Sequence, residues 1–137
     1  WIIRQSLLKE KPRGQAILPP EDIIEARVIV RQVYIDDKIE KYIVDIVFAT
    51  RFPKDNKLEK LSSYISYGAS PRATINLALA SRAYAFIKRR GYVVPEDIRS
   101  VAHDVLRHRI GLTYEAEANN INSDEIISRI LNKVEVP

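Results

Sequence analysis

The segment 71–90 constrains the fold most, because it reads as one long helix that is apolar over a wide arc. Its first stripe at helical spacing is formed by Ile75, Leu79, Ala83 and Phe86. A second stripe beside it is formed by Leu77, Ala80, Tyr84 and Ile87. Five alanines along the segment allow other helices to approach closely. We therefore predict that 71–90 is the central and most buried helix.

The hexapeptide Gly68-Ala69-Ser70-Pro71-Arg72-Ala73 marks the start of this helix. Ser70 is a residue type that caps a helix by accepting a hydrogen bond from a free backbone N–H, and Pro71 suits the first helical position. Gly68 lets the incoming chain turn sharply. The pattern predicts unfilled backbone donors beside an arginine, which is the chemistry of an anion site.

Arg72 itself stands in an unusual place. A cation in the first turn of a helix is repelled by the positive end of the helix dipole, so we expect an anion to compensate for it. A bound phosphate would satisfy Arg72, and so would an ion pair with a nearby carboxylate. The residues alone leave these two alternatives open.

Composition limits the remaining possibilities. The chain has 137 residues, 46% of them apolar and 29% charged, which is typical of a single globular domain. It has no cysteine and no apolar run of about 20 residues, so neither a disulfide framework nor a membrane span is expected. The cytoplasm is the expected compartment. The absence of methionine suggests a chain cut from a longer one.

The other segments predict a mainly α, compact helical bundle with minor short β pairing. Residues 1–19 read as a lead-in helix and linker that the Lys11–Gly14 stretch ends, and 20–137 as the helical domain. A helix over 20–32 is expected to bury Ile23, Ala26, Val30 and Val33. Further helices follow Asp36-Asp37, Pro95 and Ser123, with an exposed loop over 53–67. Short strands at 92–94 and 110–113 are expected to pair.

Several kinds of catalytic site are excluded or disfavoured. The four glycines are too dispersed for a phosphate-binding P-loop, and His103 and His108 lack the spacing of a zinc protease. No nucleophile elbow occurs. The acidic pairs Glu21-Asp22, Asp36-Asp37 and Glu96-Asp97 each stand where a helix start favours negative charge. No metal-binding residues are predicted.

A family resemblance becomes visible when the hexapeptide is combined with its neighbours. It is preceded by the segments 33–37, 42–44 and 49–51, and followed by 92–98, 105–109 and 130–137. In this order they resemble the C-terminal part of MoxR-type AAA+ ATPases over roughly residues 18–137. The resemblance implies that the chain is the helical lid of such an ATPase.

This resemblance implies an ATP hydrolase as the parent protein, using ATP and Mg²⁺ through a P-loop core that the chain lacks. Without the Walker A and Walker B motifs, the chain alone is expected to be inactive and to bind neither ligand. Arg72 resembles the sensor-2 arginine, which contacts the γ-phosphate of its own or a neighbouring subunit. Ala69, Ser70, Pro71 and Asn76 would line the nucleotide, and Tyr42 would approach the adenine.

The resemblance also implies partners. These are the missing ATPase core, further copies in a ring, commonly a hexamer, and client proteins, often with von Willebrand factor A domains, that the ring remodels or activates like a chaperone. No membrane is expected.

A different class of function stays open beside this one. A free-standing basic helical module could bind nucleic acid or a protein through a set of cationic residues, namely Lys88, Arg89, Arg90, Arg107 and Arg109. The chain carries 22 basic and 18 acidic side chains, so its net charge of +4 is small. This small, interspersed excess argues against nucleic acid as the main partner.

Overall fold

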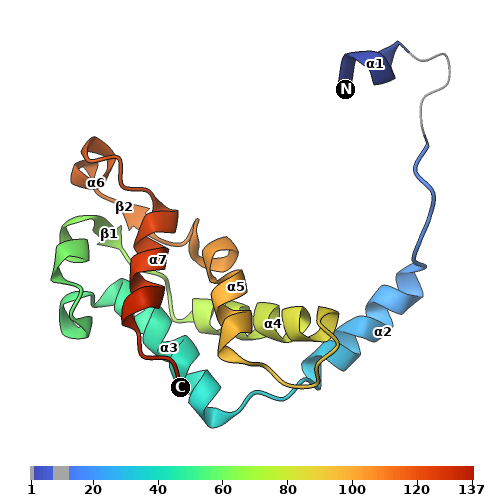
Figure 1. The fold of residues 1–137 in the computed structure, drawn as a ribbon, viewed down its shortest axis with the longest axis horizontal. Coiled ribbons are helices and arrows are strands. Elements are labelled where there is room, and N and C mark those ends of the chain that lie inside the picture. The colour runs from blue at the N-terminus through green and yellow to red at the C-terminus, as the bar shows by residue number, and fades with distance from the viewer. Residues whose placement is uncertain (1, 8–12) are drawn as a thin grey trace.

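Seven α-helices and one small sheet make up the part of the chain that the computed structural model describes, residues 2–7 and 13–137 (Figure 1). The helices are α1 (Ile2–Ser6), α2 (Pro20–Arg31), α3 (Asp37–Arg51), α4 (Arg72–Ile87), α5 (Pro95–Leu106), α6 (Tyr114–Ala118) and α7 (Ser123–Lys133). Two 3₁₀ turns, η1 (Lys54–Asn56) and η2 (Glu59–Ser63), precede strand β1 (Ile65–Tyr67), which pairs with β2 (Gly111–Leu112). The predicted mainly α class is confirmed.

The starts of the helices follow the predicted signals. α2 and α5 each begin at a proline followed by two acidic residues, and α3 begins beside Asp36. The Asn122 side chain accepts a hydrogen bond from the backbone N–H of Glu125 at 2.9 Å and so caps α7. The Lys11–Gly14 stop signal falls partly outside the described residues.

The core is built around α3, α5 and α7. Their isoleucines supply much of the buried volume, namely Ile39, Ile43, Ile46, Ile98, Ile126, Ile127 and Ile130. α4 contacts α2, α3 and α5 and lies between α3 and α2 (Figure 1). The helical bundle therefore has one continuous core. α4 has fewer buried residues than α3, so the prediction that it is the most buried helix is wrong.

The inward face of α4 differs from the prediction. Its buried residues are small ones four apart, with one leucine among them: Ala73, Leu77, Ser81 and Ala85. In the stripe predicted to be buried, Ile75 is 60% exposed and Leu79 is 44% exposed. The stripe assignment was wrong because close helix packing favours small side chains at the contact, so larger apolar residues lie outside it.

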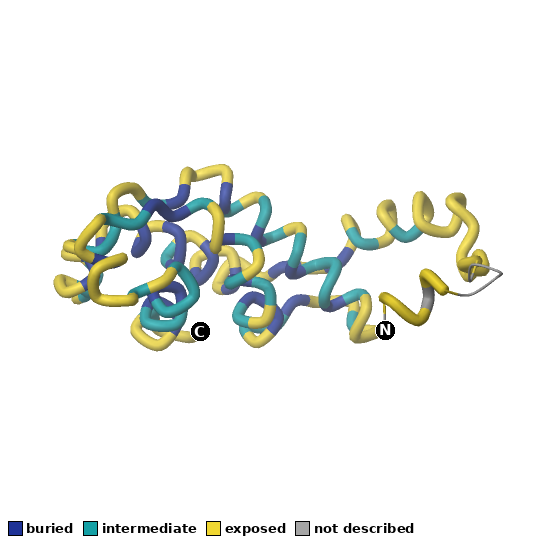
Figure 2. The backbone as a smooth tube through the Cα atoms, turned by 90° about the horizontal axis from the view of Figure 1, so that it is seen from above, coloured by how far each residue is buried: buried dark blue, intermediate teal, exposed yellow. Residues whose placement is uncertain are grey.

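α2 also departs from the prediction. No residue of α2 is buried; Ala26 and Val30 are half-buried, while Ile23 is 48% exposed. Val33 is buried, but it lies beyond the end of the helix. Figure 1 shows α2 projecting from one end of the bundle, and Figure 2 shows that most of its length is exposed. The predicted buried face is therefore wrong for most of this helix, although its boundaries are right.

The β pairing is rearranged as well. Residues 110–113 were predicted to pair with 92–94, but β2 pairs antiparallel with β1, which lies in the segment predicted to be a loop. Tyr92 instead forms an isolated parallel bridge with Tyr34. In this bridge the Tyr34 N–H donates to the Gly91 carbonyl, and the Val93 N–H donates to the Tyr34 carbonyl, each at 2.9 Å.

Within the described ranges, no helix combines the length and apolar character needed to cross a membrane.

Candidate functional site

The segment that leads into α4 is fixed by the end of α3. The backbone N–H of Ala69 donates to the Thr50 hydroxyl at 3.0 Å, and the Arg51 guanidinium donates to the Ala69 carbonyl at 3.3 Å. Thr50 and Ala69 are both fully buried. Both backbone groups of Ala69 are therefore held by side chains of α3, and we call this arrangement the Ala69 clamp.

Gly68 is required next to the clamp, but not for the reason expected from the sequence. Its backbone does not adopt a positive φ, so the glycine is not needed for an unusual turn. A Cβ atom at this position would collide with the carbonyl of Thr50. Gly68 therefore allows two backbone segments to come into direct contact.

The first turn of α4 uses its own backbone donors. The Ser70 hydroxyl accepts from the N–H of Arg72 at 3.2 Å, the kind of hydrogen bond predicted for Ser70, although the residue directly before the helix is Pro71. The N–H of Ala73 donates to the Ser70 carbonyl and that of Thr74 to the Pro71 carbonyl. The expected row of unfilled donors is therefore wrong at these three positions, and an anion would have to be bound by the Arg72 side chain. The helix begins at Arg72, one residue later than predicted.

The Arg72 side chain is exposed. No carboxylate of the described residues lies within ion-pair distance of its guanidinium. Of the two alternatives that the sequence left open, the internal ion pair is thus absent from the described structure. The five N–H donors of this guanidinium face solvent from a rigidly attached position, where they can make a bidentate contact with a phosphate or carboxylate.

Exposed apolar side chains that the sequence did not predict gather on α3 and α4. They are Val44 and Phe48 on α3, Phe52 directly after the end of α3, and Ile75 and Leu79 on α4. The rings of Phe48 and Phe52 stack with centroids 4.6 Å apart. A pocket of about 240 Å³ between α3 and α4 includes Val44 and Ile75. Val44, Phe48 and Phe52 recur at i, i+4 and i+8, and this spacing was the sequence signal for these exposed side chains.

The remaining candidate residues lie at different depths. Ala69, Ser70 and Pro71 adjoin Arg72 in the chain, and Asn76 is half-buried one turn further along α4. Tyr42 is 1% exposed and lines a separate pocket of about 240 Å³ with the chain end 135–137. Its hydroxyl has no hydrogen-bond partner among the described residues. The contact of Tyr42 with an adenine therefore stays a prediction.

The basic residues of the alternative function are partly occupied. The Arg90 guanidinium binds both carboxylate oxygens of the buried Asp97, with 2.7 Å between Nη1 and Oδ2. This hydrogen bonding raises the pKa of Arg90 above its ordinary value. Arg107 likewise pairs with Asp104 and Asp124, at 3.1 and 2.7 Å. Two of the five proposed cationic contacts are thus engaged within the protein.

No group of three or more acidic or histidine side chains within residues 2–7 and 13–137 is arranged to hold a metal ion.

Comparison with known protein families gives a match over the region that contains Arg72. A model of the AAA lid domain matches residues 60–130. The chain is 36% identical to the chaperone MoxR1 of Mycobacterium tuberculosis and 37% identical to YeaC of Bacillus subtilis, covering 92% and 90% of this chain. A crystal structure from Cytophaga hutchinsonii, described as a candidate ATPase, is 47% identical and superposes with a TM-score of 0.89 over 99% of this chain.

The matched proteins are longer than this chain. The chain spans 33% of MoxR1, 36% of YeaC and 42% of the crystallised protein.

Proposed function

Since the chain belongs to the AAA lid domain family and is of the MoxR type, we propose that it serves the ATP hydrolysis of a longer AAA+ protein, with Arg72 contacting the γ-phosphate. The P-loop core of that protein would bind ATP and Mg²⁺. The described residues offer a guanidinium for phosphate but no carboxylate cluster for the metal. The lid would therefore contribute to nucleotide binding and leave the metal to the core.

The observation that carries this proposal is the free guanidinium of Arg72 on a rigid attachment. The Ala69 clamp and the Gly68 contact fix the backbone just before α4. Because no described carboxylate neutralises Arg72, its charge is available to a ligand. The exposed apolar side chains of α3 and α4, among them Ile75 one turn after Arg72, offer an area on which another domain can pack.

In this role the guanidinium stabilises negative charge that develops on the transferred phosphoryl group. Bound ATP supplies the phosphoanhydride bond that is broken. Arg72 binds and orients the phosphate through parallel N–H donors, and the clamp passes any displacement of the arginine to α3. Loss of the γ-phosphate would thus release the lid, which links the nucleotide state to the position of the bundle.

The test is ATP turnover of the full-length protein that contains this lid. We expect Arg72→Ala to lower kcat by about 10²-fold, the usual cost of one preorganised donor to transition-state charge. Arg89→Ala is the matched control, because Arg89 is an exposed arginine just beyond the other end of α4. Equal turnover of wild type and Arg72→Ala would reject the proposal.

The parent protein would work as a ring, commonly a hexamer, in the cytoplasm, remodelling or activating client proteins that often carry von Willebrand factor A domains. In a ring, Arg72 serves either its own nucleotide or that of the next subunit. Mixing Arg72→Ala subunits with subunits whose Walker A lysine is replaced separates these cases. Activity returns only if the arginine acts on the neighbour, because only then does a mixed ring contain a complete site.

A further inference from the structure

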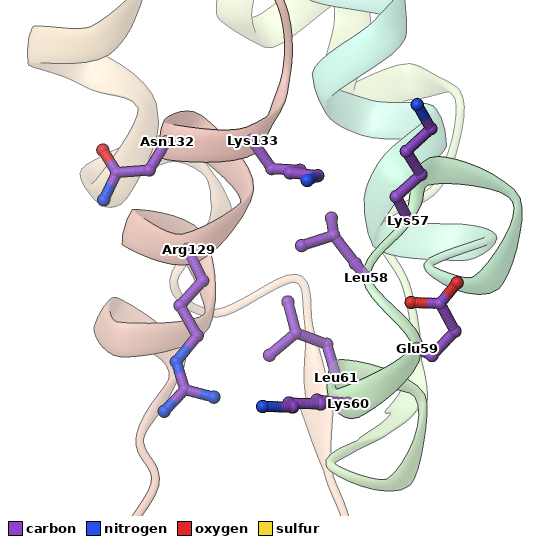
Figure 3. A pocket seen from close by; sticks show the side chains of 8 residues that line it. All are labelled: Lys57, Leu58, Glu59, Lys60, Leu61, Arg129, Asn132 and Lys133. Carbon is purple, nitrogen blue, oxygen red and sulfur yellow. The ribbon is translucent and has the colours of Figure 1, made fainter.

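A pocket that does not include Arg72 is lined by leucines and by cationic side chains. It lies between the 3₁₀ turn η2 and the last two turns of α7, with a volume of about 350 Å³. Figure 3 shows Leu58 and Leu61 between the two walls, with Lys60 on one side and Arg129 and Lys133 on the other. The volume is at the lower end of the range of ligand pockets, about 300–1,000 Å³.

Both walls of the pocket are held in place by hydrogen bonds. The N–H of Leu58 donates to the Pro53 carbonyl at 2.8 Å, and that of Leu61 donates to the Leu58 carbonyl at 2.9 Å. On the other wall, the Arg99 guanidinium donates to the Leu131 carbonyl at 2.8 Å and fixes the end of α7. The pocket is therefore a preformed feature of the bundle.

Charge around the opening is strongly one-sided. The pocket is lined by one carboxylate, that of Glu59, and by four cationic side chains, namely Lys57, Lys60, Arg129 and Lys133. Arg129 is paired with Glu125 at 2.8 Å, whereas no described carboxylate lies within ion-pair distance of the three lysines. In Figure 3, Lys60 extends toward the same end of the opening as Arg129, and Lys133 reaches across toward Leu58.

We propose that this pocket binds an acidic segment of a partner protein, with one or two large apolar side chains inserted against Leu58 and Leu61 and flanking carboxylates paired with Lys60 and Lys133. Charge complementarity selects an acidic segment over a basic one. The half-buried Leu58 selects a segment with an apolar anchor over a purely anionic ligand, because an apolar side chain packed on it removes further apolar surface from water and a phosphate does not. This site is independent of Arg72 and of nucleotide.

The test uses fluorescence anisotropy on the full-length protein without nucleotide. The probe is a labelled ten-residue peptide with a central Leu-Phe pair flanked by four glutamates on each side. One control peptide replaces Leu-Phe with Ser-Ser, and a second replaces every glutamate with glutamine. We expect the probe to bind and each control peptide to bind at least about tenfold more weakly.

Charge reversal in the pocket locates the binding. Lys60→Glu and Lys133→Glu should each weaken binding at least about fivefold, because each replaces an attraction with a repulsion. Lys38→Glu is the matched control, since Lys38 is an exposed lysine in the first turn of α3, outside this pocket. Far-UV circular dichroism confirms that the variants remain folded.

Three results would overturn the proposal. The first is no binding of the probe, and the second is equal binding of the Ser-Ser peptide, which would reduce the pocket to a charged patch. The third is self-association of the protein without peptide that Lys60→Glu abolishes, because the occupant would then be a second copy. None of these results bears on the ATP turnover of Arg72→Ala.

Discussion

The Thr50 hydroxyl bridges two parts of the chain that are 19 residues apart. It accepts from the N–H of Ala69 at 3.0 Å and donates to the Val47 carbonyl at 2.7 Å. Both hydrogen bonds are buried. One side chain thus satisfies a backbone donor that would otherwise be unpaired and ties the loop before α4 to the last turn of α3.

Replacing this hydroxyl at constant shape should therefore be costly. Thr50→Val leaves the N–H of Ala69 buried without an acceptor, and we expect the free energy of unfolding to fall by about 1–3 kcal/mol. Urea denaturation followed by circular dichroism measures the change. Thr50→Ser, which keeps the acceptor, should lose less; if valine and serine were equally harmful, the hydroxyl would not be the cause.

Gly68 should tolerate no side chain. Gly68→Ala places a methyl group against the Thr50 carbonyl and forces α3 and the start of α4 apart. We expect destabilisation of about 1–3 kcal/mol. Gly91→Ala is the matched control, since a Cβ there meets no atom within 4 Å. Equal melting temperatures of the two variants would contradict the steric argument.

Asp97 should stabilise the connection between α4 and α5. Its carboxylate accepts from the backbone N–H of Val94 at 2.9 Å while it binds Arg90, so it caps α5 and anchors the preceding turn. Asp97→Asn removes the charge, and we expect the melting temperature to fall by roughly 5–10 °C. The neighbouring Glu96→Gln, at an exposed position in the same helical turn, should change it little.

Arg72→Lys distinguishes a forked contact from a simple positive charge. A lysine keeps the charge but cannot form two parallel hydrogen bonds with one phosphate. We expect turnover of the full-length protein with Arg72→Lys to stay closer to that of Arg72→Ala than to wild type. Full activity of the lysine variant would mean that charge alone is sufficient and would remove the bidentate contact from the mechanism.

Helix boundaries could be predicted well because their signals are local. Prolines at 20 and 95 and the acidic residues behind them define helix starts without reference to the rest of the chain. The inward face of α4 could not be predicted in the same way. Both apolar stripes of this helix repeat at helical spacing. Whether the stripe of Ile75 or that of Leu77 is buried depends on how closely the neighbouring helices approach.

In the candidate site, too, the features set by local sequence could be predicted and those set by tertiary contacts could not. Arg72 and the hydrogen bond that Ser70 accepts were visible in the hexapeptide, since both depend on position in one helical turn. The Ala69 clamp was not, because it joins Thr50 to a residue that only folding brings near. The strand pairing failed for this reason too: which segment lies beside β2 is decided by tertiary contacts and not by local β preference.

The bridge between Tyr34 and Tyr92 determines where the chain from α2 joins the bundle. The junction lies beside the turn after α4, whereas Arg72 stands at the opposite end of that helix. Sixteen helical residues at about 1.5 Å each separate the two by about 24 Å. If the bundle rotates about this junction by about 5°, the start of α4 with Arg72 is displaced by about 2 Å over this length. A displacement of this size is enough to make or break a hydrogen bond.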